Sequence, residues 1–355
     1  MPKKHSMPVK DRAVKPGLAT GSEFLSVDRC QAIHRIIVRA RVLEERMIKM
    51  SKSGEGFFWI GGPGEEAFNA CLGLQVKKGQ GPAFDYLLFK YRNSAAMIAM
   101  GMDLSDGVRQ MAMRWSDPFS AGRNFAGHFS RKAWNVVPVT PVIEVQFVMA
   151  PGTALMQKRH GDGVTIVVGG DAGSAEGDFA SCLIWSTRPG NELPVLMLTT
   201  NNRFGISTSH ASQHSCEHTT ERGKAFGIPG EVVDGNDPVA SWFAIERALR
   251  YCRSTRRPFM LEAMVSRLYG HSSSSGAPHS GEPDCLALLE ERLLAAGLAD
   301  RAALDQVHEE ATAEVEAAVE KVTHEPAPRP EDVEKFTYAP SKVDPVYPDD
   351  YTGLP

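Results

Sequence analysis

The fold of this chain is decided by residues 164–208, which read VTIVVGGDAGSAEGDFASCLIWSTRPGNELPVLMLTTNNRFGIST. Residues 164–168 form an apolar, β-branched run that is long enough for a strand and too short for a helix. A helix is expected from 176 to about 187, where an Arg-Pro-Gly-Asn sequence ends it, and a second buried strand is expected at 193–198. The stretch therefore predicts one β-α-β unit, with parallel strands joined by a right-handed crossover.

Two oxygen-bearing side chains follow the predicted strands. Asp171 comes just after the first strand and Asn202 just after the second. Since the carboxyl ends of parallel strands point the same way, both side chains are expected at the crevice where open α/β sheets bind ligands. Carboxylate and amide oxygens suit Mg²⁺, and the backbone N–H groups at the next helix start suit an anion. The residues alone therefore predict a Mg²⁺-bridged diphosphate site. The Gly-Asp-Gly at 161–163 precedes the strand, so we interpret it as a turn.

A series of short motifs resembles one known family, the alpha subunit of the dehydrogenase component of 2-oxo acid dehydrogenase complexes, which uses thiamine diphosphate. The motifs are GEEA (64–67), YR (91–92), GDA (170–172), EGDF (176–179), NN (201–202) and RLYGHS (267–272). The resemblance covers about residues 26–279. It implies an α/β, thiamine-diphosphate-binding fold, with a mostly parallel sheet and helices on both faces. The alternative is an ordinary β-α-β unit of another α/β enzyme.

The resemblance also implies a set of cofactor-binding residues. Tyr91 and Arg92 stand where the family contacts the diphosphate, and a hydroxyl and a planar guanidinium suit phosphate oxygens. Ile143 falls where the family places a leucine beneath the bent thiamine. The whole implied set is Tyr91, Arg92, Ile143, Gly170, Asp171, Ala172, Gly173, Asn202, Phe204, Ile206 and His271.

Catalytic and metal-binding roles are implied in the same way. His271 follows a predicted strand, and its ordinary pKa near ~6.5 suits proton chemistry. The family's RxxGHS motif makes His271 the catalytic candidate and Arg267 its supporting or phosphate-contacting neighbour. Asp171, Asn202 and the backbone carbonyl of Phe204 are the implied Mg²⁺ ligands. A loop histidine with a backbone partner is the alternative for His271.

The chain departs from the family pattern at three places. Pro141 stands where relatives have a serine, and Glu144 where they have a small residue. The loop after His271 reads SSSSGAPH, without the paired aspartates of the family. A K⁺ site and phosphorylation of Ser272 are therefore not carried over. The aromatic residues Phe58 and Trp59, before GEEA, are expected in the pocket wall.

The function implied by the resemblance is oxidative decarboxylation of a 2-oxo acid, with acyl transfer to a lipoyl domain of the acyltransferase component. The glutamate that activates the cofactor belongs to a beta subunit in this family, so a heterotetramer is expected. The segment GRNFAGH (122–128) resembles the corresponding segment of the branched-chain branch of the family, which favours branched-chain 2-oxo acids over pyruvate or acetoin. A nicotinamide enzyme is disfavoured because no G-x-G-x-x-G follows a strand. A non-catalytic interaction subunit with the same fold stays open.

Length and composition set the remaining expectations. The 355 residues carry a net charge of −4, which gives no basic surface for nucleic acid. No apolar run reaches the ~18 residues of a membrane span, and six cysteines without a C-x-x-C indicate free thiols in the cytoplasm. We expect a flexible extension at 1–25, one domain at 26–323 and a Pro-rich tail at 324–355. The histidines at 210, 214 and 218 would share one face of a helix and suit Zn²⁺, or be exposed side chains without a ligand.

Overall fold

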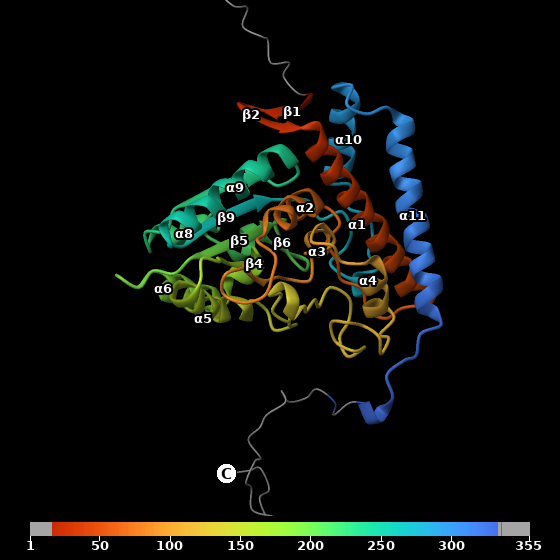
Figure 1. Cartoon of the computed structure of the whole chain (residues 1–355), viewed down its shortest axis with the longest axis horizontal. Coiled ribbons are helices and arrows are strands. Elements are labelled where there is room, and N and C mark those ends of the chain that lie inside the picture. Colours follow the sequence, from red (N-terminus) through yellow and green to blue (C-terminus); the bar gives the residue numbers. More distant parts are fainter. Residues whose placement is uncertain (1–15, 333–334, 336–355) are drawn as a thin grey trace, which may run out of the picture.

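The computed structural model describes residues 16–332 and residue 335, and its centre is a five-stranded parallel sheet (Figure 1). The strand order is β3-β4-β5-β9-β8, and every neighbouring pair is parallel. The strands are β3 (Tyr86–Leu88), β4 (Thr165–Gly170), β5 (Val195–Asn201), β8 (Gly230–Asp234) and β9 (Phe259–Met264). The predicted α/β fold class is confirmed.

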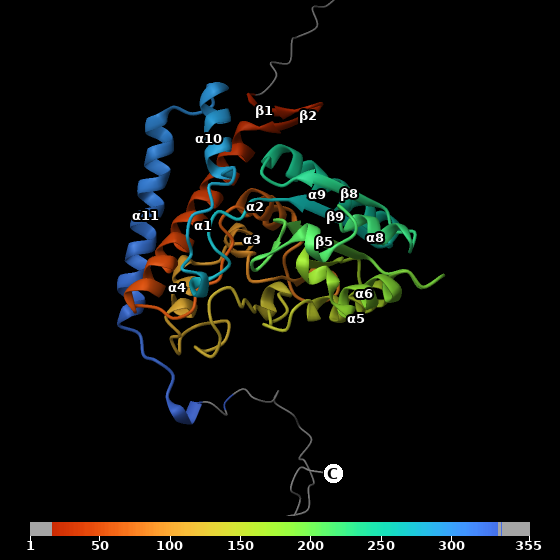
Figure 2. The same cartoon turned by 180° about the vertical axis from the view of Figure 1, so that it is seen from behind.

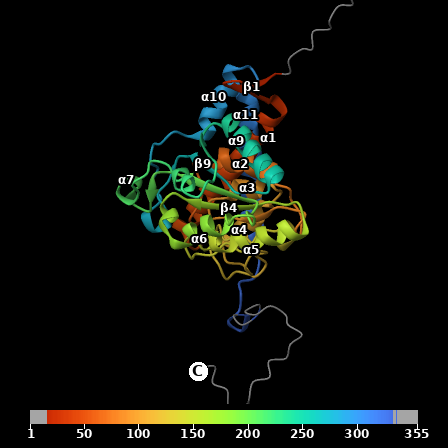
Figure 3. The same cartoon turned by 90° about the vertical axis from the view of Figure 1, so that its left-hand side faces the viewer.

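Helices cover both faces of the sheet (Figures 1 and 3). On one face lie α5 (Val145–His160) and α6 (Gly177–Ser186), which pack on the side chains of Val167, Val195 and Met197. Ile166, Val168 and Leu198 point to the opposite core, because side chains alternate along a strand. That core contains α2 (Glu66–Gln75), α3 (Ser94–Ala99), α4 (Leu104–Met111) and α9 (Pro238–Thr255).

A further layer of helices lies outside this core. The 27-residue helix α1 (Val27–Ser53) ends at Gly54, whose φ of 82° is the left-handed conformation that favours glycine. Two C-terminal helices, α10 (Cys285–Ala295) and α11 (Arg301–Thr323), pack against α1, and α11 runs alongside it (Figure 2). The short remaining elements are α7 (His210–Gln213), α8 (Thr220–Lys224), β6 (Phe204–Gly205), β7 (Thr208–Ser209) and the 3₁₀ helices η1 (Lys132–Trp134), η2 (Ala172–Ala175), η3 (Ser273–Ser275) and η4 (Pro330–Asp332).

The N-terminal part of the described chain differs from the expected extension. Residues 17–26 form an antiparallel hairpin of β1 (Gly17–Thr20) and β2 (Glu23–Ser26). Its Leu18 and Leu25 are buried, and Thr20 Oγ1 donates to Asp237 Oδ2 at 2.6 Å. The expectation of an unstructured extension is therefore wrong for residues 17–25, because contacts distant in sequence hold them. Residues 1–15, and most of the tail expected at 324–355, lie outside the described residues.

Strands β4 and β5 extend further toward the site than their apolar runs suggest. Both include polar or glycine residues at the carboxyl end, and the pairing continues to Gly170 opposite Thr200. Asn201 is buried there, and its Nδ2 donates to Glu262 Oε1 at 2.7 Å. An apolar pattern misses such positions because the hydrogen-bonded ladder, not side-chain hydrophobicity, defines them. Within the described residues, no helix has the length and apolar character needed to cross a membrane.

Candidate functional site

The ends of β4 and β5 bring two oxygen-bearing side chains together. Asp171 follows Gly170, and Asn202 follows Asn201, on strands that are direct neighbours in the sheet. Both side chains are buried and line the same cavity. The two strands are adjacent and parallel as expected, so the predicted convergence at the carboxyl edge of the sheet is present.

A cavity of about 170 Å³ lies at this edge. All eleven residues expected to bind the cofactor line it: Tyr91, Arg92, Ile143, Gly170, Asp171, Ala172, Gly173, Asn202, Phe204, Ile206 and His271. These residues come from separate parts of the chain, between α2 and η3. The structure thus brings the predicted set together, while the binding role of each stays a prediction.

Asp171 has a partner that was not expected from the sequence. His210 Nδ1 lies 3.1 Å from Asp171 Oδ2, and the other ring nitrogen of His210 lies 3.1 Å from the carbonyl of Cys216. This contact orients the carboxylate and leaves its second oxygen for a metal. The proposed helical face of three histidines is wrong, because α7 ends at Gln213 and His214 lies beyond it. Within residues 16–332, the histidines at 210, 214 and 218 form no group close enough to share a metal.

The loop after Asn202 is strained. Asn202 Oδ1 accepts a hydrogen bond from the backbone N–H of Phe204 at 3.1 Å, which closes a tight turn. Arg203 and Ile206 have φ angles of 65° and 56°, in a left-handed region that is costly for a β-branched residue. The turn brings Phe204 and Ile206 to the cavity, so strain is stored in a segment that shapes the site.

Two cationic side chains, Lys90 and Arg92, line the cavity. Lys90 Nζ is 3.2 Å and Arg92 Nε is 3.6 Å from the buried carboxylate of Glu65. Arg92 also donates to the carbonyl of Gly61, and its Nη2 lies 3.3 Å from His271 Nδ1. Lys90 was missed in the sequence because it precedes the YR motif and its partner lies 25 residues away. Glu65 offsets only part of the positive charge of Lys90 and Arg92. The cavity that these two side chains line therefore suits an anion.

His271 is a neutral imidazole in this setting. Burial first, and then the charges of Arg92, Arg267 and Lys90, lower the pKa of His271 to about 4. Because Arg92 Nη2 is a donor, His271 Nδ1 must accept, and the ring proton is assigned to Nε2. His271 can therefore donate one hydrogen bond into the cavity at neutral pH.

Arg267 lies behind the cavity wall. Its Nη1 donates to the carbonyl of Ile206 at 2.8 Å, and its guanidinium lies 5.2 Å from the centre of the Phe204 ring. Burial and the neighbouring Arg92 lower the pKa of Arg267. Arg267 contacts the strained loop and does not itself line the cavity, while its supporting or phosphate-contacting role stays a prediction.

Glu144 enters the cavity, which the sequence did not indicate beyond its departure from the family pattern. Its Oε1 accepts from the backbone N–H of Gly170 at 3.1 Å, and a Cβ added at Gly173 would lie only 2.0 Å from that oxygen. Burial is the main cause that raises the pKa of Glu144 to about 8. The group is therefore mostly protonated at neutral pH and adds little negative charge to the cavity.

The aromatic residues before the GEEA motif lie elsewhere. Trp59 is fully buried in the core, where its Nε1 donates to Glu44 Oε2 at 2.7 Å. Phe58 packs edge to face on Phe125, with ring centres 5.0 Å apart. Neither side chain lines the cavity, so the expectation that they form its wall is wrong.

The donor set fits a magnesium diphosphate. A carboxylate from Asp171 and an amide oxygen from Asn202 are the hard ligands that Mg²⁺ prefers, and His210 contacts the Asp171 carboxylate. An added Cβ at Gly170 would meet nothing within 4 Å, so the turn leaves open space above its backbone. The nearby cationic side chains compensate the negative charge of a diphosphate. The residues present therefore fit a magnesium diphosphate.

A parallel sheet of this order, with its cavity at the carboxyl ends of β4 and β5, defines an α/β protein of the thiamine-diphosphate-binding fold. The chain belongs to the family described as "Dehydrogenase E1 component", which matches residues 34–331. That family is generally dependent on thiamine diphosphate.

Curated relatives name two kinds of 2-oxo acid dehydrogenase. The 2-oxoisovalerate dehydrogenase subunit alpha of Bacillus subtilis is 28% identical over 319 residues, covering 86% of this chain and 94% of the relative. The pyruvate dehydrogenase E1 component subunit alpha of Rhizobium meliloti is 27% identical over 82% of this chain and 84% of the relative. The mitochondrial 2-oxoisovalerate dehydrogenase subunit alpha 2 of Arabidopsis thaliana is 28% identical over 72% of this chain, which spans 53% of that relative. The expected resemblance to such alpha subunits is confirmed.

Proposed function

We propose that this chain is the alpha subunit of a thiamine-diphosphate-dependent 2-oxo acid dehydrogenase. The observation that supports it most is that the eleven residues expected to bind the cofactor line one cavity at the ends of β4 and β5. The family match covers most of the chain and agrees with this assignment. The proposed reaction is oxidative decarboxylation of a 2-oxo acid, with transfer of the acyl group to a lipoyl domain.

Different residues of the cavity would bind different parts of the cofactor. Asp171, Asn202 and the Phe204 carbonyl hold Mg²⁺, while Tyr91 and Arg92 hold the diphosphate. Thiamine diphosphate, when bound, supplies the carbon nucleophile and the electron sink for loss of CO₂. Ile143 would contact the cofactor, since its apolar side chain is exposed at the cavity.

His271 is the proton-handling residue of the proposal. Its neutral ring donates at Nε2 because Arg92 occupies Nδ1. Such a donor can stabilise negative charge that develops on a substrate oxygen, and it can take up or release a proton during acyl transfer. Arg267 positions the loop that faces His271, through its hydrogen bond to the Ile206 carbonyl.

A beta subunit completes the proposed site. The rim of the cavity carries exposed apolar side chains at Val142, Ile143 and Ile206, which are 60%, 57% and 63% exposed. Exposed apolar side chains gathered at the opening of a cavity are typical of a surface that a partner covers. We propose that the beta subunit covers it and contributes the glutamate that activates the cofactor, in an α₂β₂ heterotetramer of the cytoplasm.

A branched-chain 2-oxo acid is the proposed substrate. The segment at 122–128 and the Bacillus subtilis relative, whose name specifies 2-oxoisovalerate, both favour it. Pyruvate is the second candidate, because relatives named for pyruvate match with similar identity.

The test is a titration of thiamine diphosphate and Mg²⁺ into this chain mixed with its beta partner, followed by isothermal calorimetry. We expect saturable binding that Asp171→Ala abolishes. The matched control is Asp162→Ala in the Gly-Asp-Gly turn before β4, where the carboxylate is exposed and pairs with Lys77 at the surface. Absence of binding by the wild type contradicts the proposal. Binding without decarboxylation of any 2-oxo acid supports a non-catalytic subunit instead.

A further inference from the structure

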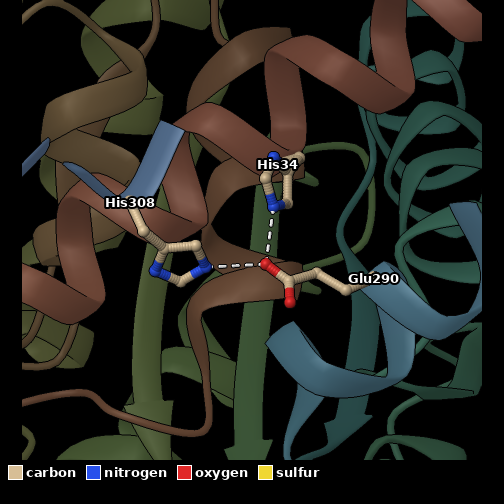
Figure 4. A group of neighbouring side chains, drawn as sticks. All are labelled: His34, Glu290 and His308. Carbon is tan, nitrogen blue, oxygen red and sulfur yellow. Dashed lines mark hydrogen bonds and ion pairs between the residues drawn. The ribbon is translucent and has the colours of Figure 1, made fainter. Parts of the chain in front are cut away.

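A second cluster of ligand-type side chains lies among the outer helices. His34 of α1, Glu290 of α10 and His308 of α11 point toward one another (Figure 4). Among the described residues 16–332, this is the one group of three histidine, cysteine or acidic side chains whose ligand atoms converge closely enough for a metal ion. None of the three lines the cavity at the ends of β4 and β5.

The two histidines of the cluster converge on one carboxylate oxygen. His34 Nε2 lies 2.9 Å and His308 Nε2 lies 2.7 Å from the same oxygen, Glu290 Oε1. The two rings are steeply inclined, at 70°, with centres 6.2 Å apart, so their Nε2 atoms approach the carboxylate from different directions. In a tetrahedral zinc site, with bonds of about 2.0 to 2.1 Å, neighbouring ligand atoms are about 3.4 Å apart. A shift of roughly half an ångström per contact therefore makes room for the ion.

The charge states also suit a metal. Burial, only partly offset by Glu290, lowers the pKa of His34. Burial acts to raise the pKa of Glu290, but the hydrogen bonds from His34 and His308 outweigh it and the pKa is lowered. Two imidazoles and one carboxylate are a ligand set that Zn²⁺ accepts.

We propose that His34, Glu290 and His308 form a binding site for a divalent transition-metal ion of the Zn²⁺ type. Glu290 binds through Oε1 alone. Its Oε2 faces Arg301 Nη1 at 3.8 Å, a contact that orients the carboxylate from outside the shell. Water takes the fourth position, and the ion enters past His308, whose side chain is 37% exposed.

The surroundings leave space for that water. A cavity of about 90 Å³ borders His34 and is lined on the other side by α11 residues such as Ala303 and Leu304. The ion would join α1 to both C-terminal helices, at a point about two turns after the start of α11. Because the metal binds the folded arrangement and not the unfolded chain, its binding stabilises the packing of α10 and α11 on α1.

The alternative is that the three side chains only hydrogen-bond to one another, without a metal ion. Three variants distinguish this hydrogen-bonded cluster from a metal site. His308→Gln keeps a hydrogen-bond donor toward Glu290 but removes the imidazole ligand. Glu290→Gln keeps an oxygen that accepts from both histidines but removes the charge. The matched control is His324→Gln, because His324 is an exposed histidine directly after the same helix α11.

The experiment is calorimetric titration of Zn²⁺ into the full chain after EDTA treatment and dialysis, with excess Mg²⁺ present to occupy oxygen-ligand sites. We expect one Zn²⁺ per chain, and a Tm at least about 3 °C higher with Zn²⁺ than without. His308→Gln and Glu290→Gln should each weaken binding by about tenfold or more, while His324→Gln and Asp171→Ala leave it unchanged.

Co²⁺ replacing Zn²⁺ gives a second readout, since a four-coordinate site absorbs visible light strongly and hexahydrated Co²⁺ does not. No stoichiometric Zn²⁺ binding by the wild type, or equal binding by wild type and His308→Gln, overturns the proposal. These measurements need neither thiamine diphosphate nor the beta subunit, so their outcome is independent of the proposed function.

Discussion

Two titratable side chains in the cavity are both held neutral, for different reasons. His271 loses its proton because it is buried beside three cations, and Glu144 keeps its proton mainly because it is buried. The cavity therefore combines fixed positive charge from Lys90 and Arg92 with two uncharged hydrogen-bonding groups. An anion entering this cavity meets attraction without a competing ionised carboxylate at Glu144.

Glu144→Gln tests that balance. Above its pKa of about 8, Glu144 ionises next to Gly170 and Asp171, and the new charge repels a diphosphate. The affinity of the wild type for thiamine diphosphate should fall up to about tenfold from pH 7 to pH 9. The variant should bind with little change over that range, as measured by calorimetry with the beta partner. Glu221→Gln, at an exposed glutamate on α8, is the control and should keep the fall.

The lowered pKa of His271 predicts that the free energy of unfolding depends on pH. Its pKa is about 4 in the folded chain against 6.5 ordinarily, so between these values the unfolded chain binds more protons. Stability should therefore rise with pH through this window. In His271→Gln that contribution is absent, and the loss of unfolding free energy from pH 7 to pH 5 should be about 1 kcal/mol smaller than in the wild type. Urea unfolding measures it, with the exposed His160→Gln as control; equal losses in all three chains contradict the assignment.

At the level of elements, the turn between β5 and β7 has a strained backbone and borders the cavity. Ile206 is held at a φ of 56° although its side chain is 63% exposed and gains little from packing. Neighbouring residues hold this strained backbone. Arg267 donates a hydrogen bond to the carbonyl of Ile206, and the paired strands β6 and β7 flank the turn. Such a segment keeps its shape before a ligand arrives.

Ile206→Gly should relieve this strain. Glycine tolerates the left-handed region, so the unfolding free energy should rise by about 1 kcal/mol, despite the greater entropy of the unfolded glycine chain. Ile184→Gly is the matched control: Ile184 is also an exposed isoleucine, but it lies within α6, where glycine should destabilise by about 1 kcal/mol. Chemical denaturation of both variants tests the opposite signs.

The sequence predicted the elements whose signals are local. The strands β4 and β5, the crossover helix α6 and the convergence of Asp171 with Asn202 follow from apolar runs and turn residues. The β1–β2 hairpin was missed because distant contacts hold it. Lys90, Glu144 and His210 were missed in the site for the same reason: each meets its partner across more than twenty residues, and no spacing rule reports that contact.

At the scale of the whole molecule, the apolar rim of the cavity is the feature that indicates a binding partner. Val142 lies in the segment before α5, and Ile206 lies in the strained turn, yet both border one opening. Their exposure costs little in an isolated chain, and it favours association when a second chain covers them.

Val142→Asp should weaken heteromer formation. A charge placed at the covered rim must be desolvated, so the affinity for the beta subunit should fall at least about tenfold while the isolated chain stays folded. Size-exclusion chromatography and circular dichroism measure the two effects. Leu288→Asp, at an exposed leucine on α10, is the control and should assemble normally. Normal assembly of Val142→Asp contradicts the proposed interface.

The register of β4 and β5 has a consequence for tolerated changes in chain length. Pairing fixes Gly170 opposite Thr200, and thereby the separation of Asp171 from Asn202. Deleting one residue inside β4 would move Asp171 by about 3.3 Å along the sheet and turn its side chain to the other face. Extra residues at the exposed Pro189-Gly190 turn, between the same two strands, only lengthen a connection. Related chains should therefore vary in length at that turn and stay constant in length along both strands.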